Sequence, residues 1–200
     1  VMSVADVLAA RTIVEPLTLP MCSPIGDGAA AVILVSERKA RELGLRNKVR
    51  VAASALVSGW DTDPGESVGA LAARQAYEAA GIGPGELSCV ELHDASAPSE
   101  LVAYEYLGLC PPGGSIELIE TGATRLGGRI PVNTSGGLLR KGHPVGATGC
   151  AQIVELTEQL QGRSGLRQVN GARIALAHNG GGAIGSDAAA TVVTLLVKEG

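Results

Sequence analysis

The spacing of apolar residues along the chain predicts strands alternating with helices. Residues 29–35 form a continuous run of small and β-branched apolar side chains, which predicts a buried strand. Residues 49–58 alternate imperfectly between apolar and polar and predict a second strand. Apolar residues recur at helical spacing over 68–80, where Gly81 is placed to end the helix, and again over 146–160.

Shorter patterns fill most of the remaining chain. We expect further helices at 4–11, 37–43 and 98–107, the second of them capped by Ser36. A short strand at 89–92 and two closing strands at 173–177 and 188–197 complete the strands, and residues 61–65 predict a loop. Because strands and helices alternate, the fold class is α/β, with a sheet covered by helices.

Composition supports a folded domain and excludes several kinds of partner. Hydrophobic residues make up 46% of the 200 positions, which is enough for a core. A net charge of −4 argues against nucleic acid as a partner. No apolar run is long enough for a membrane span, and no secretory signal begins the sequence, so we expect a cytoplasmic protein. A first residue that is Val rather than Met leads us to expect that the sequence begins inside a longer chain.

The cysteines form no recognisable metal or redox motif. They stand at positions 22, 89, 110 and 150, with no Cys-x-x-Cys pair among them. We therefore expect no metal ion and interpret the four thiols as small buried side chains, with Cys150 packing inside its helix.

The three histidines of the chain each stand in a polar cluster at the end of an element. His93 follows the strand expected at 89–92, His143 lies in the polar segment 133–149, and His178 precedes three glycines. A single histidine is more often structural than functional. Three beside glycine-rich turns favour a site, because imidazole exchanges protons near neutral pH and glycine lets backbone N–H groups approach a ligand. The glycines match neither a Walker A loop nor a dinucleotide fingerprint.

Several of these segments resemble one enzyme family. Residues 132–149, read as Val-Asn-x-x-Gly-Gly through Gly-His-Pro-x-Gly-Ala-Thr-Gly, match a thiolase motif almost letter for letter. Glu91-Leu92-His93-Asp94 resembles the His-Asp version of a second motif, and residues 22–34 resemble a third. Essentially the whole chain is thus similar to the C-terminal half of thiolases, closest to the sterol-carrier and lipid-transfer branch. The resemblance implies a thiolase-like C-terminal domain with a mixed five-stranded sheet layered with helices, in which residues 1–20 belong to the tail of a preceding region.

The resemblance also implies roles for individual residues. His143 would deprotonate a nucleophilic cysteine and polarise the thioester oxygen, and His93 would hold a water or donate to an enolate oxygen. His178 stands near an acid–base position of the family. The oxyanion and substrate-binding residues would be Asn133, Gly142, Asn179 and Gly180, with Gly180 offering its backbone N–H. Such chemistry needs a thiolate, a proton shuttle and separate oxyanion sites.

Departures from the family pattern leave three readings open. The nucleophilic cysteine belongs to an N-terminal half that this sequence lacks, and Ala95 replaces a second, acid–base cysteine. The first reading is an acyltransferase of the acetyl-CoA acyltransferase class, inactive as this chain alone, which needs the N-terminal half from the same or a separate chain. The second is an aldolase acting on hydroxyacyl-CoA with an OB-fold and zinc-ribbon partner. The third is a non-catalytic acyl-CoA-binding scaffold.

Some features are common to all three readings or stay undecided. A CoA thioester would be the substrate, no further cofactor is expected, and a homodimer or higher oligomer is expected. Tyr104 and Tyr106 are conceivable acids, but their helical setting favours packing. The glycine-rich stretch 111–131 would line an acyl pocket or lie at an interface.

Overall fold

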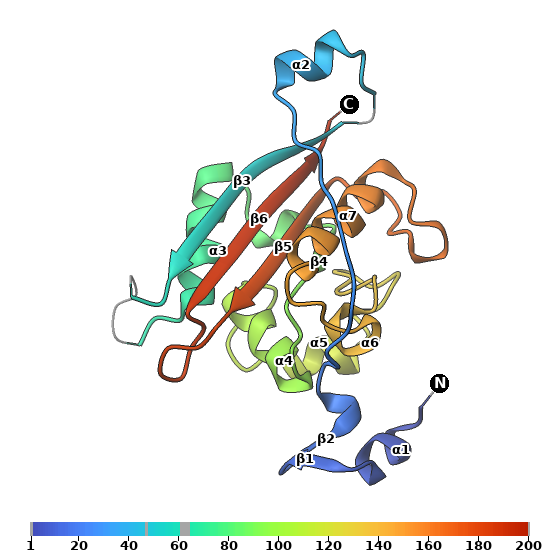
Figure 1. Ribbon diagram of the computed structural model, residues 1–200, viewed down its shortest axis with the longest axis vertical. Helices are drawn as coiled ribbons and strands as arrows, with labels where there is room; N and C mark the ends of the chain where they lie inside the picture. Colours follow the sequence, from blue (N-terminus) through green and yellow to red (C-terminus); the bar gives the residue numbers. More distant parts are fainter. Residues whose placement is uncertain (1, 47, 61–64, 200) are drawn as a thin grey trace.

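The main sheet of the computed structural model has four strands. The structure describes residues 2–46, 48–60 and 65–199. The strands lie in the order β3 (Val49–Ser58), β6 (Ala190–Lys198), β5 (Ile174–Gly181) and β4 (Cys89–Glu91) (Figure 1). β6 runs antiparallel to both neighbours, whereas β4 and β5 are parallel. The α/β class and the mixed sheet are confirmed, but with four strands rather than five.

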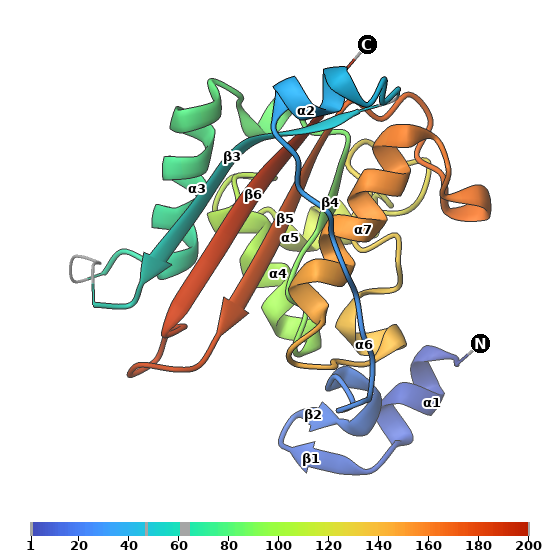
Figure 2. The same ribbon diagram turned by 45° about the horizontal axis from the view of Figure 1, so that its top comes forward.

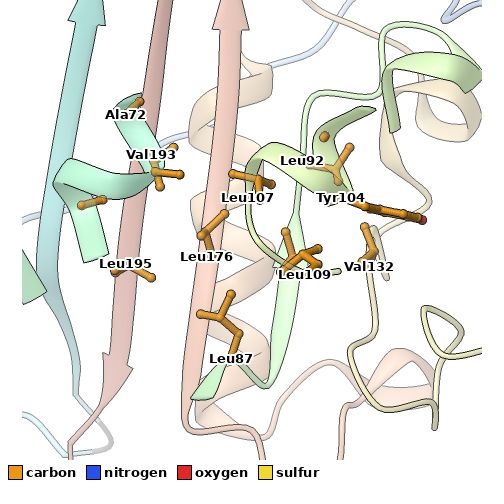
Figure 3. Close-up of a cluster of buried hydrophobic side chains, with 14 of the residues drawn as sticks. Ala72, Leu87, Leu92, Tyr104, Leu107, Leu109, Val132, Leu176, Val193 and Leu195 are labelled. Atoms are coloured by element: carbon orange, nitrogen blue, oxygen red, sulfur yellow. The ribbon is translucent and has the colours of Figure 1, made fainter. Parts of the chain in front are cut away.

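Alternating residues of the central strands pack against helices on opposite faces of this sheet. Leu176, Val193 and Leu195 face a core shared with α3 (Val68–Ala80) and α4 (Ala97–Tyr106), as Figure 3 shows. The intervening residues pack against α7 (Thr148–Gln161) on the other face; they are Ala175, Ala177 and Leu196. This period of two follows from the pleat of a strand and explains why β5 and β6 are apolar almost throughout.

Helix bounds follow the sequence signals closely. α3 covers the residues predicted for it; Ser67 Oγ accepts a hydrogen bond from the N–H of Ala70, and Gly81 ends the helix at φ +65°. α2 (Glu37–Glu42) begins after Ser36, whose Oγ accepts from the N–H of Lys39. The loop expected at 61–65 lies outside the described residues except for Gly65.

Residues 29–35 do not form the predicted buried strand. They run extended past α7 without a partner strand (Figure 2), and Ile33 and Leu34 are 90% and 77% exposed. No other strand of the described chain lies beside them to accept their backbone hydrogen bonds. The apolar pattern therefore predicted an extended conformation correctly but placed it wrongly in the core.

Two other expectations also need correction. The glycines of 111–133 predict a long irregular stretch, but this stretch contains α5 (Ser115–Glu120) and contributes Leu118 and Ile130 to the core. Of the four cysteines only Cys89 is buried, while Cys150 is exposed on α7. Cys150 lies on a face of α7 that is turned away from the sheet. Its position inside an apolar helix therefore did not mean that its side chain is buried.

The remaining elements are short. Residues 4–21 form a small unit below the sheet in Figure 1, tied to the domain by a bridge between Cys22 and Ser96. Its elements are α1 (Val4–Ala9), β1 (Thr12–Val14), β2 (Leu17–Thr18) and the turn η1 (Leu19–Met21). α6 (Gly137–Lys141), η2 (Pro84–Glu86) and η3 (Gly165–Arg167) complete the described chain. No helix in the described parts is long and apolar enough to cross a bilayer.

Candidate functional site

The three histidines meet at one edge of the sheet. His93 follows β4 and His178 lies near the end of β5, and the carboxyl ends of these parallel strands share an edge. His143 arrives on the loop that precedes α7. All three line one cavity of about 630 Å³, together with Asn179 and Gly180. The structure thus brings together five of the seven residues predicted from the sequence.

The hydrogen bonds around His143 favour one tautomer. Its Nδ1 lies 2.8 Å from Oγ1 of Thr148, and that hydroxyl lies 3.1 Å from the carbonyl oxygen of Pro144, which can only accept. We assign the single proton of the hydroxyl to Pro144, so that the hydroxyl accepts from Nδ1–H of His143. The lone pair of Nε2 is therefore available at the cavity, as a general base requires.

His93 meets His143 edge to face and is held neutral. The ring centroids lie 4.8 Å apart at an interplanar angle of 88°. Burial, with a smaller contribution from the charge of His143, lowers the pKa of His93 to about 4. Its Nδ1 is buried and has no hydrogen-bond partner among the described residues, while the residue itself lines the cavity.

Both ring nitrogens of His178 are engaged. The backbone N–H of His93 donates to Nδ1 of His178 over 3.4 Å, which places the proton of the neutral ring on Nε2. Nε2 lies 3.0 Å from the hydroxyl oxygen of Tyr106 and donates to it. Burial, followed by the charge of His93, lowers the pKa of His178 to about 3, so this imidazole is neutral at pH 7.

Helix α7 fixes the end of β5 through one buried amide. Nε2 of Gln152 donates to the carbonyl oxygen of His178 at 3.1 Å, and Oε1 of Gln152 accepts from Nδ2 of Asn179 at 3.1 Å. Gln152 is 1% exposed. A buried amide satisfied on both sides holds its neighbours in one position, here the backbone of His178 and the side chain of Asn179.

Asn133 and Gly142 do not line the cavity but shape the loops around it. Asn133 adopts φ +51°; its Oδ1 accepts from the N–H of Leu92 at 2.9 Å, and its own N–H donates to the oxygen of Val90 at 2.8 Å. It therefore joins the end of β4 to the loop that leads to His143. Gly142 adopts φ +85°, a conformation that favours glycine, immediately before His143.

Asp94 anchors the same loop from the other side. Its carboxylate accepts from the N–H groups of Leu138 and Leu139 at 2.7 and 3.3 Å, at the start of α6. A Cβ on Gly137 would lie 2.2 Å from Oδ2 of Asp94, so only glycine fits there. Burial raises the pKa of Asp94 to about 6 despite these two bonds.

Two buried carboxylates accept hydrogen bonds from the segment 133–137. Oε1 of Glu91 accepts from the N–H of Ser135 at 3.0 Å, and burial raises the pKa of Glu91. Glu155 pairs with Arg167 at 2.8 Å. Burial acts to raise the pKa of Glu155, but the hydrogen bonds from Arg167 and Gln159 outweigh it, so the pKa lies below its ordinary value.

Sequence reasoning missed three residues of the site. Thr148 and Gln152 lie on α7, four residues apart and therefore on the same face of the helix. Their polar side chains interrupt the apolar pattern of the helix, and this interruption was the signal by which they could have been found. Tyr106 was assigned to packing, yet it lines the cavity. Residues 111–131 contribute nothing to the cavity wall, so the expectation that they line a pocket there is not met.

A second, larger cavity of about 800 Å³ lies elsewhere. The exposed segment 31–35, β3 and α7 form its walls, and none of the three histidines reaches it. It is the space left between the unpaired segment and the sheet, and it holds no cluster of chemically active side chains comparable with the histidine site.

Comparison with known proteins identifies the family. Residues 48–194 match the model of the thiolase C-terminal domain-like family. The chain belongs to the thiolase family. Sterol carrier protein 2 of Homo sapiens is 42% identical over 203 residues, which cover 96% of this chain and 36% of that protein. An acetyl-CoA acetyltransferase of Methanothermobacter thermautotrophicus is 44% identical over 192 residues, covering 93% of this chain and 50% of that protein.

A solved structure supports the likeness at the level of the fold. The Ltp2-ChsH2(DUF35) aldolase superposes with a TM-score of 0.79 at 26% identity, over 96% of this chain and 51% of that one. The present chain therefore spans a third to a half of the length of these thiolase-family proteins. Its histidine site lies within the part that they share.

Proposed function

We propose that this chain is the C-terminal half of a thiolase-type acyltransferase that cleaves or forms a carbon–carbon bond next to a CoA thioester. In the cleavage direction a cysteine thiolate attacks the 3-keto carbon of a 3-oxoacyl-CoA. The bond between C2 and C3 breaks, the acyl group stays on sulfur, and the acetyl-CoA enolate takes up a proton at C2. A second CoA thiolate then removes the acyl group from the enzyme.

The residues of the cavity take the roles that this chemistry needs. Nε2 of His143 accepts the proton of the thiol, because its lone pair faces the cavity. His93, which is neutral and lines the cavity, hydrogen-bonds the enolate oxygen or a water. Gly180, which also lines the cavity, offers its N–H to the oxyanion, and Asn179 and His178 lie next to it on β5. Asn133 and Gly142 hold the loop of His143 in place.

The observation that carries this proposal is the pairing of His143 with Thr148 beside the edge-to-face ring of His93. It places the basic imidazole of His143 beside a second imidazole in the wall of a single cavity. A binding scaffold has no need of a histidine held in a defined tautomer, so we rank the scaffold reading below the catalytic ones.

The nucleophile comes from outside these 200 residues. None of the four cysteines lines the cavity. The exposed apolar residues Ile33 and Leu34 lie in an extended segment without a partner strand, which fits an N-terminal half, from the same or a separate chain, packed against it. A homodimer, and a location in the cytoplasm, are further parts of this proposal.

Thiolysis of acetoacetyl-CoA by the full-length natural protein tests the proposal. We expect acetyl-CoA to form, and His143→Gln to lower kcat by at least about 100-fold, as removal of a general base does. Cys150→Ser is the matched control, since this exposed thiol follows the same loop and should leave kcat unchanged. Unaltered turnover in His143→Gln would exclude the assigned role.

A second candidate is retro-aldol cleavage of a 3-hydroxyacyl-CoA. Two observations favour it: Ala95 lines the cavity at the position of the family's second thiol, and the structural relative above is an aldolase with a DUF35 partner. In this case an OB-fold and zinc-ribbon subunit would be the partner. Release of an aldehyde or ketone from a 3-hydroxyacyl-CoA, without any acylated cysteine, would distinguish it from the thiolase reaction.

A further inference from the structure

Tyr106 is the one phenol in the wall of the histidine cavity. It lies at the end of α4, and its ring stacks edge-on against His178 with the centroids 5.3 Å apart. The other two tyrosines bond to protein groups elsewhere: the hydroxyl of Tyr77 donates to the carbonyl oxygen of Leu107, and that of Tyr104 to Glu100. Tyr106 thus differs from them in facing a cavity.

The position of the ring is fixed by a glycine in the neighbouring helix. A Cβ on Gly69 of α3 would lie 2.7 Å from Cε2 of Tyr106 and 2.9 Å from Cδ2, so the ring occupies the space that a side chain would fill. Glycine inside a helix lowers helix stability relative to alanine, yet this one allows close contact between α3 and the tyrosine. The ring is therefore held in place by packing, independently of its hydroxyl.

The direction of the Tyr106–His178 hydrogen bond follows from the bonds around His178. Nδ1 of His178 accepts from the backbone of His93, so Nε2 carries the proton and donates to the phenol oxygen. The phenol oxygen is then an acceptor in this bond, and its own proton is left over. Among the described residues, no further hydrogen bond of Tyr106 uses that proton, and Tyr106 lines the cavity.

We propose that Tyr106 is a specificity-determining residue whose O–H donates a hydrogen bond to an oxygen on the acyl chain of the substrate. The inference rests on the proposed acyl-CoA function and adds to it a residue that recognises the acyl oxygen. His93 and His143 are neighbours in the cavity and serve the thioester and the thiol in that function. His178 is then the residue that positions the phenol donor.

Calorimetric titration of the full-length protein with three CoA esters tests this inference. Acetoacetyl-CoA and 3-hydroxybutyryl-CoA carry the acyl oxygen, whereas butyryl-CoA lacks it. We expect the wild type to bind the two oxygenated esters about 10-fold more tightly than butyryl-CoA, as one well-placed hydrogen bond in a dry site provides. In Tyr106→Phe, which keeps the ring against Gly69, the preference should disappear while the affinity for butyryl-CoA stays within about twofold.

Tyr77→Phe is the matched control, because it also removes one phenol hydroxyl that is hydrogen-bonded inside the protein. Tyr77 does not line the cavity. It should keep the 10-fold preference. A wild type that binds all three esters equally, or a Tyr106→Phe protein that keeps the preference, overturns the inference and leaves the proposed function standing. A wild type that binds no CoA ester at all overturns both.

Discussion

Replacing Thr148 by valine should disable His143 without disturbing the fold. Thr148 is 1% exposed, and its hydroxyl is the acceptor for Nδ1–H of His143. Valine has the same shape but no acceptor. The carbonyl oxygen of Pro144 keeps a partner, because it also accepts from the backbone N–H of residue 148 at 3.0 Å. The substitution therefore removes only the hydrogen bond that selects the tautomer of His143.

The size of the effect follows from the strength of that hydrogen bond. A bond of about 1 kcal/mol selects one tautomer over the other about fivefold, and leaving the buried N–H unpaired costs about 1–3 kcal/mol. Together these should lower kcat for thiolysis by about 10-fold or more, since about 1.4 kcal/mol of barrier is a factor of ten. KM for the acyl-CoA should change little, because Thr148 does not line the cavity.

Thr148→Ser is the control, since it keeps the hydroxyl and loses only a methyl group. We expect it to lose about 1 kcal/mol of stability and to keep most of its activity. Steady-state thiolysis and thermal melting by circular dichroism measure both quantities for each variant. A folded Thr148→Val protein with kcat within twofold of the wild type would refute the reasoning, and so would equal losses of activity in the serine and valine variants.

Three further predictions concern the loops and the acid response of the site. Gly137→Ala should lower the melting temperature clearly and disable the site, because the new Cβ would fall 2.2 Å from the carboxylate of Asp94 at a φ of +60°; a stable, active variant would contradict this. Gly180→Ala should fold normally, since its Cβ meets no atom closer than 3.9 Å, but should weaken acyl-CoA binding measured by calorimetry by protruding into the cavity; unchanged affinity would count against the placement of the substrate. The pKa of His93 is about 4 when folded against 6.5 when unfolded, so between these values only the unfolded chain gains the proton. In urea unfolding, this contribution of His93 should lower the free energy of unfolding by up to about 3 kcal/mol from pH 6.5 to 4, and His93→Gln should remove it. His178, whose folded pKa is about 3, acts in the same sense in both proteins, and Asp94, whose folded pKa is raised, acts in the opposite sense.

The parts of the fold that were predictable are those that local chemistry decides. α3 was predicted residue for residue, because an apolar stripe and a glycine at its end indicate the same bounds, which the cap at Ser67 also supports in the structure. The strand over 49–58 was predicted equally well from its alternation. In each case the element buries one face against a neighbour contained in the same 200 residues.

The parts that were not predictable depend on neighbours rather than on pattern. Residues 29–35 have the composition of a buried strand, but the described chain offers them no strand to pair with. Tyr106 has helical spacing that favours the core, and only the three-dimensional arrangement shows that a glycine on α3 turns its ring toward the cavity. Likewise, the sequence indicated the three histidines but not the hydrogen bonds that fix their tautomers.

Mass spectrometry of an acid-quenched reaction tests the central claim most directly. The full-length natural protein, with any subunit that copurifies, is mixed with acetoacetyl-CoA and digested for peptide mapping. The account predicts an acetyl thioester on a cysteine outside the 200 residues of this chain, which forms in the wild type and is lost in His143→Gln. Acetylation of Cys22, Cys89, Cys110 or Cys150 instead, or cleavage of the substrate with no acylated cysteine anywhere, would contradict it.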